Sequence, residues 1–368
     1  MEPVVKHSSL DSWGFGPLFA TALSSIARPE LTPARVVSDL GARLELVDAT
    51  GAVGLAQPSG RLRHTLDPRL RPTVGDWVAI ARPSSSDGLA VIHEVLPRRT
   101  ALVRRAAGRR DDEQVIAANV DTFLVVTSAN RDANPRRIER YVTAVWDSGA
   151  VPVIVVNKAD LCAPEALSAQ LAALAVVAPG VRLAAVSARS GAGLDALADY
   201  LRPGHTIALI GSSGVGKSSL VNALLGHEHQ AVLPIDAEDR GRHTTTRREL
   251  FALPSGGLVI DTPGMRELGL IDGGDGLDEA FAEITELAAH CRFRDCKHRG
   301  EPGCAIEEAI AEGRLDPDRR AGLDKLAREL AAIERRRDPA LAREDRARWK
   351  AINKGQRARA RVDPKLKR

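Results

Sequence analysis

The sequence predicts an α/β domain on a parallel sheet, with an OB-type β-barrel before it and a helical, metal-binding module after it. Three observations predict this division. Residues 35–107 hold short β-type runs, residues 110–272 alternate apolar and helical runs, and residues 275–337 hold helical runs around a cysteine cluster. An N-terminal segment, 1–34, and a basic C-terminal tail, 338–368, complete the chain.

Composition and charge limit the classes of protein that fit. At 368 residues the chain is long enough for two or three domains, and 44% apolar with 27% charged residues is typical of globular proteins. Residues 335–368 contain 14 Lys and Arg against 4 Asp and Glu, so the other 334 residues carry 38 basic against 44 acidic side chains. A polyanionic partner is therefore expected to meet the C-terminus first.

The N-terminus lacks the charged and apolar pattern of a signal peptide, and no stretch approaches the roughly 18 apolar residues of a spanning helix. We therefore expect a cytoplasmic monomer without membrane contact. In a reducing cytosol, clustered cysteines indicate metal ligands before disulfides.

The expected barrel rests on five β-type runs separated by turn residues: ARVVSDL, ARLELVDATG, AVGLAQPSG, VGDWVAIARP and LAVIHEVLP. Five short strands indicate a small barrel of the oligonucleotide-binding type or a structural spacer, and pattern alone does not choose between them. Six arginines follow the last run and either pair with phosphates or form a solvated loop. They are Arg98, Arg99, Arg104, Arg105, Arg109 and Arg110.

The α/β domain rests on five near-continuous apolar runs: NVDTFLVVTSA, VPVIVVNKAD, VRLAAVSARS, HTIALIGSSG and GGLVIDTPG. Such runs, separated by helical stretches, predict a parallel sheet covered on both faces. Polar motifs stand where these runs end, which is where α/β sheets bind ligands.

The stretch GSSGVGKSS, 211–219, fits the spacing Gly-x4-Gly-Lys-Ser of a phosphate-binding loop and stands between a strand and a helix. We expect backbone N–H groups to meet the β-phosphate, Lys217 to bridge β and γ oxygens, and Ser218 to ligate Mg²⁺. The expected phosphate-binding set is Gly211, Ser212, Ser213, Gly214, Val215, Gly216, Lys217, Ser218 and Ser219.

Two further motifs predict which base the site holds. In NKAD, Asp160 can accept hydrogen bonds from guanine N1–H and its exocyclic amine, whereas adenine offers neither donor there. Asn157 is expected to tie this loop to the phosphate loop, and Lys158 to lay its stem along the base and sugar. Ser187 and Ala188 begin the motif SAR, whose Ala188 N–H would meet guanine O6.

Two segments match the switches of a GTPase. In DTPG, Asp261 is expected near Mg²⁺ and the Gly264 N–H near the γ-phosphate. In GRHTTTRRE, 241–249, any of three consecutive threonines could cover Mg²⁺, and Thr245, the middle one, stands for them in the expected site. The alternative interpretation of DTPG is an Asp at a strand end followed by a turn. The alternative interpretation of the threonine segment is a solvated polar loop.

The order of these five elements is base, base, phosphate, switch, switch, whereas a conventional GTPase runs phosphate, switch, switch, base, base. Cutting the ring of elements after the second switch and joining the old ends near 201–206 gives the present order with the sheet intact. The sequence therefore predicts a circularly permuted P-loop GTPase domain.

The cysteine cluster has the spacing Cys-x4-Cys-x-His-x5-Cys, with ligands Cys291, Cys296, His298 and Cys304. Three thiolates and one imidazole complete a closed tetrahedral Zn²⁺ site, which is structural because no position is left for water. A segment of about 60 residues has a marginal core, so the metal is expected to stabilise it.

With these motifs assembled, the chain closely resembles the ribosome small-subunit-dependent GTPase A family (RsgA/YjeQ). The resemblance rests on GDWV at 75–78, the permuted motif order, GRHTTT at 241–246 and the Cys/His cluster, and covers roughly 35–335. It implies GTP and GDP as ligands, with Mg²⁺ and one structural Zn²⁺. It also implies a late assembly factor that binds the immature 30S subunit and its 16S rRNA, hydrolyses GTP when stimulated by the subunit, and leaves.

Two alternatives stay open at this point. One is a GTP-gated RNA-binding module whose hydrolysis is incidental. The other is a permuted GTPase that acts on the large subunit, although that resembles chains without this barrel and zinc cluster.

The expected catalytic residues are His243 and Lys217. A conventional GTPase often orients the attacking water with Gln directly after the Asp-x-x-Gly glycine, a place that Met265 takes here. A thioether cannot donate a hydrogen bond to water, so another group must serve. The imidazole of His243 is the nearest candidate by motif, and the competing interpretation is that it meets only RNA or solvent.

Overall fold

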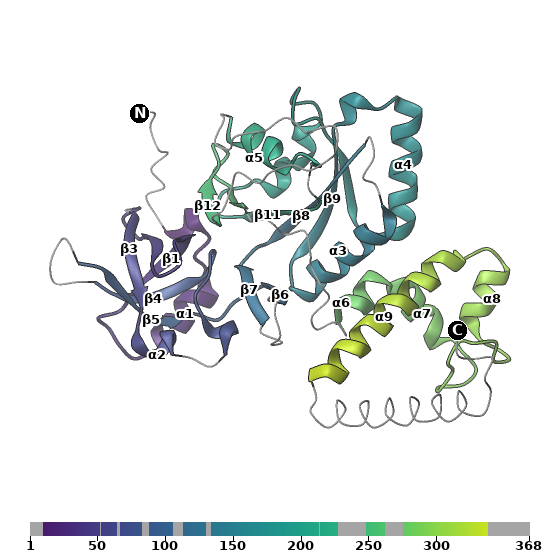
Figure 1. Cartoon of the computed structure of the whole chain (residues 1–368), viewed down its shortest axis with the longest axis horizontal. Coiled ribbons are helices and arrows are strands. Elements are labelled where there is room, and N and C mark those ends of the chain that lie inside the picture. The colour runs from purple at the N-terminus through teal and green to yellow at the C-terminus, as the bar shows by residue number, and fades with distance from the viewer. Residues whose placement is uncertain are drawn as a thin grey trace, which may run out of the picture.

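The computed structural model describes residues 10–51, 53–64, 67–82, 88–105, 113–129, 134–212, 214–226, 248–261 and 275–337. Figure 1 shows a barrel on one side, an α/β domain in the middle and a helical module on the other side. The predicted fold class, a permuted α/β domain with a barrel before it and a helical module after it, is confirmed.

The barrel has five strands in the order β1-β2-β3-β5-β4, closed by pairing between β1 and β4. All pairs are antiparallel except β3 with β5. This closed order with one parallel pair is that of an OB-type barrel, and each of the five predicted runs forms one strand. The strands are β1 Thr32–Asp39, β2 Leu44–Asp48, β3 Val53–Pro58, β4 Trp77–Ala81 and β5 Ala90–Val95, with α2 Gly60–Arg63 and a 3₁₀ turn, Pro68–Leu70, between β3 and β4.

A helix that the sequence reading did not predict covers one side of the barrel. After a 3₁₀ turn, Leu10–Trp13, helix α1 spans Pro17–Ser25 and buries Phe19 against Trp77 of β4. The Phe15 ring lies edge-on to Trp77, with 4.8 Å between ring centroids. Aromatic residues from two segments therefore form a small separate core here.

The α/β sheet runs β10-β9-β8-β11-β13-β12, and all neighbours are parallel except β12 with β13. Successive residues of β8 face opposite sides, with Phe123 in one core and Leu124 in the other. Helices α3 and α4 cover the first face and α5 the second, so the central strands are buried on both sides. The elements are β8 Thr122–Ser128, α3 Pro135–Asp147, β9 Val151–Asn157, α4 Pro164–Val177, β10 Arg182–Ala185, β11 Thr206–Ile210, α5 Lys217–Leu225, β12 Glu249–Ala252 and β13 Leu258–Asp261.

The strand order places the phosphate loop at the centre of the sheet. From β11 the chain continues to β12 and β13 on one side, whereas β8, β9 and β10 fill the other side. The direction of winding thus reverses between β11 and β8, and ligands bind beside such a reversal at the carboxyl ends of the strands.

A two-stranded ribbon connects the barrel to the α/β domain. Strand β6 (Ala101–Arg105) pairs with β7 (Glu113–Ala118) in a sheet of its own. The boundary predicted from the sequence, between 107 and 110, lies between these two paired strands. The pattern of either strand alone does not show that the two pair.

A buried arginine joins the barrel to the phosphate-loop strand. Arg35, on β1, is 1% exposed and donates to the carbonyl of Gly75 (3.3 Å), the carbonyl of Asn119 (3.2 Å) and the Thr206 hydroxyl at the start of β11 (3.0 Å). It also donates to the carbonyl of Trp13. Burial lowers the pKa of Arg35 to about 10, so the guanidinium is charged at neutral pH.

The C-terminal module consists of α6 (Asp275–Ala280), α7 (Ala282–Ala289), α8 (Ala305–Ala311) and α9 (Pro317–Arg337). Its core contacts Trp146 of α3, so the module lies on the α/β domain. Arg319 of α9, 3% exposed, donates to Glu139 of α3 at 3.1 Å and to Glu283 of α7 at 2.6 Å. In the described ranges, no helix is both long and apolar enough to cross a membrane.

Candidate nucleotide site and metal centre

The phosphate loop packs so closely that two of its positions require glycine. Gly211 has φ +148°, and a Cβ there would lie 2.1 Å from the carbonyl oxygen of Val126 on β8. Gly216 has φ +92°, and a Cβ there would lie 2.4 Å from Asn157 Nδ2. The motif's glycines therefore serve both backbone conformation and close packing.

Two lysines fold onto the carbonyls of the loop. Lys217 Nζ donates to Gly211 O at 2.7 Å and to Ser212 O at 2.6 Å, and Lys158 Nζ donates to Gly214 O at 2.6 Å. Lys158 has φ +61°, a left-handed conformation that is unusual for a non-glycine residue and clusters at functional sites. Both amines therefore lie at the loop that would receive phosphates.

Asn157 connects the loops that follow three strands. Its Nδ2 donates to Val215 O at 2.9 Å and to Gly216 O at 3.3 Å, and its Oδ1 accepts from Ala188 N at 3.0 Å. The side chain is 1% exposed. The expected tie between NKAD and the phosphate loop is present. The Ala188 N–H, which is expected to meet guanine O6, donates to Asn157.

The remaining base-reading residues lie at the same edge of the sheet. Asp160 is exposed in a 3₁₀ turn directly after β9, so its carboxylate can meet a ligand. Ser187 is buried, and its hydroxyl accepts from Ser190 N at 3.2 Å, which shapes the turn that presents Ala188.

The magnesium and switch residues are only partly described. Ser218 and Ser219 lie in the first turn of α5, half-buried, and Asp261 ends β13, 8% exposed. The two strands that lead to Asp261 and the phosphate loop, β13 and β11, are parallel neighbours. Ser213, His243, Thr245, Gly264 and Met265 lie outside the described residues.

One contact to the phosphate loop was missed from the sequence. Arg137 Nη1 of α3 donates to the Ser212 hydroxyl. Asn134 accepts from Arg136 N and Arg137 N and so begins the helix that carries Arg137. An Asn-Pro pair before a helical run was the available signal, although it predicts the helix start and not the contact.

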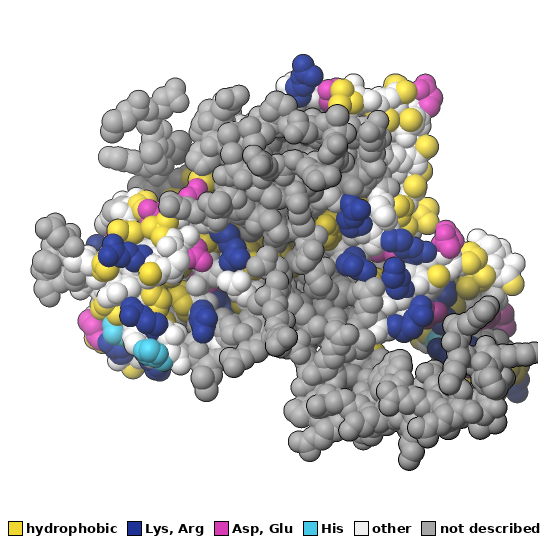
Figure 2. All heavy atoms as spheres, in the orientation of Figure 1, with side chains coloured by type: hydrophobic (Ala, Val, Ile, Leu, Met, Phe, Trp, Pro, Cys, Tyr) yellow, Lys and Arg dark blue, Asp and Glu magenta, His cyan; other side chains and the backbone are white. Residues whose placement is uncertain are grey.

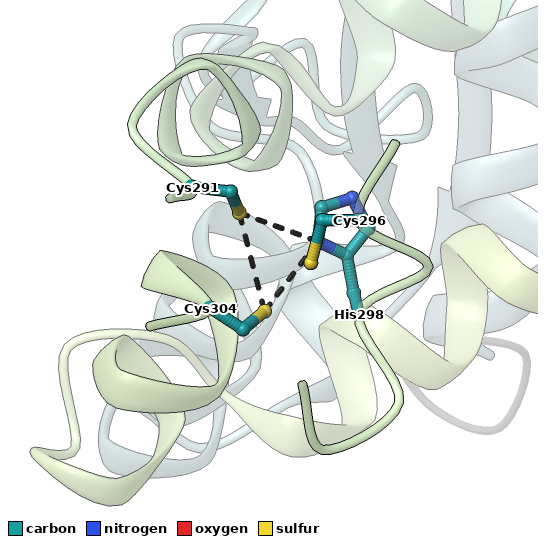
Figure 3. Close-up of side chains that lie close together, drawn as sticks. All are labelled: Cys291, Cys296, His298 and Cys304. Atoms are coloured by element: carbon teal, nitrogen blue, oxygen red, sulfur yellow. Dashed lines mark hydrogen bonds between the residues drawn. The ribbon is translucent and has the colours of Figure 1, made fainter. Parts of the chain in front are cut away.

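Three cysteines and one histidine meet between α7 and α8 (Figure 3). Cys291 Sγ and Cys304 Sγ are 4.0 Å apart, and each lies 3.4 Å from His298 Nδ1. The four ligand atoms, including Cys296 Sγ, lie within 4.8 Å of one another. Zn–S bonds of about 2.3 Å in a tetrahedron place sulfurs about 3.8 Å apart, so the set fits a structural zinc ion.

The loop between the ligands is organised by Glu301, which sequence reasoning also missed. Its carboxylate accepts from Lys297 N at 3.1 Å and Arg299 N at 2.5 Å. The bond from Arg299 is the main reason that the pKa of Glu301 lies below its usual range. Between these partners His298 takes φ +57°, which turns its ring toward the cysteines.

The arginines after the barrel do not all face solvent. Arg98 is 14% exposed, and its Nε and Nη2 donate to the two carboxylate oxygens of Asp76 in the GDWV stretch, each at 2.7 Å. Burial raises the pKa of Asp76, and the Arg98 bonds oppose that shift. Arg99 pairs with Asp121 at 3.2 Å. Arg98 and Arg99 therefore each pair with a carboxylate. Arg99 is still exposed, so a contact of these arginines with phosphates stays a prediction.

Comparison with known proteins identifies relatives over nearly the whole chain. The family model described as RsgA GTPase matches residues 95–271. The chain is 49% identical to the small ribosomal subunit biogenesis GTPase RsgA of Opitutus terrae, over 96% of this chain and 99% of that protein. It is 42% identical to the protein of the same name from Streptomyces coelicolor, over 94% and 93% of the two chains.

Solved structures agree with the fold. YjeQ from Thermotoga maritima superposes with a TM-score of 0.62 and 27% identity, over 82% of this chain and 99% of that one. YloQ, described as a circularly permuted GTPase, superposes with a TM-score of 0.58 and 24% identity, over 85% and 98% of the two chains.

Proposed function

This chain belongs to the RsgA GTPase family, and we propose that it hydrolyses GTP during maturation of the small ribosomal subunit. Relatives named small ribosomal subunit biogenesis GTPases, matched over nearly its whole length, support this. The observation that carries the proposal is the bridge made by Asn157 between the phosphate loop and the turn before Ala188. It holds the phosphate-binding and base-reading loops together, as a guanine nucleotide requires.

The chain's own residues bind the nucleotide at both ends. Backbone N–H groups of 214–218 receive the phosphates at the N-terminus of α5, where the helix dipole favours negative charge. Lys217 exchanges its carbonyl partners for phosphate oxygens, a stronger acceptor. Asp160 accepts from guanine N1–H and the exocyclic amine, and Ala188 N–H is shared with O6.

We include Mg²⁺ as a cofactor of this site. Ser218 lies at the start of α5, which follows β11, and Asp261 ends β13, the parallel neighbour of β11. Both offer oxygen ligands, which magnesium prefers. Thr245 is expected to cover the ion, and the Gly264 N–H is expected near the γ-phosphate. The ion would supply charge neutralisation at the β and γ oxygens.

His243 is proposed to position the attacking water in place of the glutamine that Met265 replaces. A positioned acid or base contributes roughly 10² to 10⁴ in rate. His243→Ala is therefore expected to lower the subunit-stimulated turnover by about 10²-fold or more, while GTP affinity and subunit binding stay the same. A variant that binds normally and keeps full turnover would leave the chemistry to Lys217, Mg²⁺ or a ribosomal group.

The partner proposed is the 30S subunit, met through its 16S rRNA by a cytoplasmic monomer. An OB-type barrel and a basic tail, 338–368, support an RNA partner. On the face shown in Figure 2, Lys and Arg side chains lie over both the barrel and the α/β domain.

The deciding experiment measures GTP turnover with 30S subunits, 50S subunits and naked rRNA. Stimulation by 30S subunits above the other two supports the proposal. Stimulation by 50S subunits would assign the chain to the large subunit, and equal binding of RNA with no stimulation would make hydrolysis incidental.

A further inference from the structure

One aromatic side chain of the zinc module faces solvent. Phe293 lies between the ligands Cys291 and Cys296 and is 43% exposed. Only 3% of the chain is aromatic, and Phe293 is the one aromatic residue among the large apolar side chains that are exposed in the described ranges. Burial of such a ring would be favourable, so its exposure suggests a contact made with a partner.

The ring is held on a fixed support. Zinc ligands flank it on both sides, and Cys296 N donates to Phe293 O at 3.2 Å in a tight turn. Arg292 N donates to Gly303 O at 3.0 Å, which anchors the loop to the residue before Cys304. A ring on a fixed loop loses little conformational freedom when a ligand binds to it.

The surroundings of the ring are positively charged. The Arg292 guanidinium lies 5.5 Å from the ring centroid, a cation–π distance. Residues 291–300 hold four basic side chains, Arg292, Arg294, Lys297 and Arg299, against the single acid Asp295. Residues 301–312 hold four glutamates and neither Lys nor Arg. Positive charge is thus concentrated at the loop that carries the ring, and a polyanion would approach this side first.

We propose that Phe293 and Arg292 form a platform on which an unpaired RNA base stacks, while the neighbouring basic side chains contact phosphates of the same RNA. This inference rests on the proposed function. Sequence-specific and structure-specific RNA contacts favour unstacked bases on aromatic rings and guanidinium planes. A protein partner fits less well, because apolar hot spots lie within further apolar surface. Within 275–337, no other large apolar side chain is strongly exposed among those described.

The test measures binding of the full zinc-loaded chain to 30S subunits. Stacking is worth roughly 1–3 kcal/mol per base, so Phe293→Leu, which keeps an apolar side chain but loses the ring face, should weaken binding about 5- to 150-fold. Phe293→Trp should bind as tightly as the natural chain. Neither change removes a phosphate contact, so the salt dependence of binding should keep its slope.

Val176→Ala is the matched control, because Val176 is 52% exposed on α4, outside the zinc module, and its loss should leave binding unchanged. Equal zinc content checks the folding of each variant. As a second measurement, a single-stranded RNA that contains 2-aminopurine should lose fluorescence on the natural chain, because stacking quenches that base.

The outcomes separate the two proposals. If the natural chain binds 30S subunits and Phe293→Leu binds them equally, with no quenching of 2-aminopurine, the platform is refuted and the proposed function stands. Retention in Phe293→Leu with loss in Phe293→Trp would indicate an apolar protein contact and would also refute the platform. Failure of the natural chain to bind 30S subunits would refute the proposed function itself.

Discussion

Removing the side chain of Arg319 should detach the zinc module from the α/β domain. The guanidinium lies 3.9 Å from the Phe281 ring centroid and donates to Glu139, Glu283 and two backbone carbonyls, those of Val177 and Ala280. Glu139 is 2% exposed and pairs with both Arg319 and Arg136, so Arg319→Met leaves this buried carboxylate with Arg136 alone, at 3.1 Å. Breaking a buried pair in this way costs about 3–5 kcal/mol.

Urea denaturation of the zinc-loaded protein measures this cost. Release of zinc to a chromogenic chelator reports the module. Tryptophan fluorescence adds a signal from Trp146, one of the four tryptophans, which contacts the cores on both sides of the interface. For a slope of about 2 kcal/mol per molar urea, the midpoint of zinc release should fall by about 1.5–2.5 M. Arg314→Met removes an arginine that is 56% exposed, so it should change the free energy of unfolding by no more than about 0.5 kcal/mol.

A double variant tests the pairing itself. Replacing Arg319 and Glu139 together, as Met and Leu, should cost less than the sum of the two single changes, because the buried Glu139 carboxylate is removed together with its Arg319 partner. Additive losses, or an unchanged midpoint in Arg319→Met, would show that the ion pair does not hold the module in place.

Three further changes test the nucleotide site and the pH dependence of stability. Asp160→Asn should lose GTP affinity and gain relative preference for xanthosine triphosphate, and unchanged GTP binding in a titration would remove NKAD from the site. Gly211→Ala should abolish GTP binding because the new Cβ would lie 2.1 Å from Val126 O; a calorimetric titration that finds normal affinity would refute the packing argument. Desolvation lowers the pKa of His205 below 6.5 in the folded chain. As the pH falls, the unfolded chain therefore binds a proton before the folded chain does, and the stability present above about pH 6.5 is lost. His205→Gln should therefore show a flatter decline of thermal stability as the pH falls below about 6.5, and an identical decline would exclude His205 as its source.

Local pattern predicted most of the fold. The five barrel strands and the five parallel strands each follow from an apolar run that ends in turn residues or a polar motif. Strand β12 was missed because its four residues, Glu249–Ala252, adjoin a polar switch segment. Helix α1 was missed because its apolar residues serve a contact with Trp77, about 60 residues further along the chain.

Short motifs predicted the residues of the nucleotide site and the zinc site. They did not predict the buried arginines that hold the barrel and the zinc module against the α/β domain. Arg35 and Arg319 resemble surface arginines in the sequence, since arginine is rarely buried unless it is paired. Their partners lie far away in the chain: Thr206 is 171 residues from Arg35, and Glu139 is 180 residues from Arg319. Only the folded chain brings such groups together, so burial of these charges could not be deduced from neighbouring residues.

The contacts of Arg35 also bear on how this protein can evolve. Its guanidinium meets Asn119, which in turn donates to the Gly75 carbonyl at 3.1 Å and accepts from Arg99 N at 2.9 Å. A recombination event that exchanged the barrel alone would leave Asn119 and Thr206 facing a foreign β1 strand without a matching charge. We therefore expect a foreign barrel to be tolerated only when it brings a matching group for Asn119 and Thr206, or when these two residues change with it.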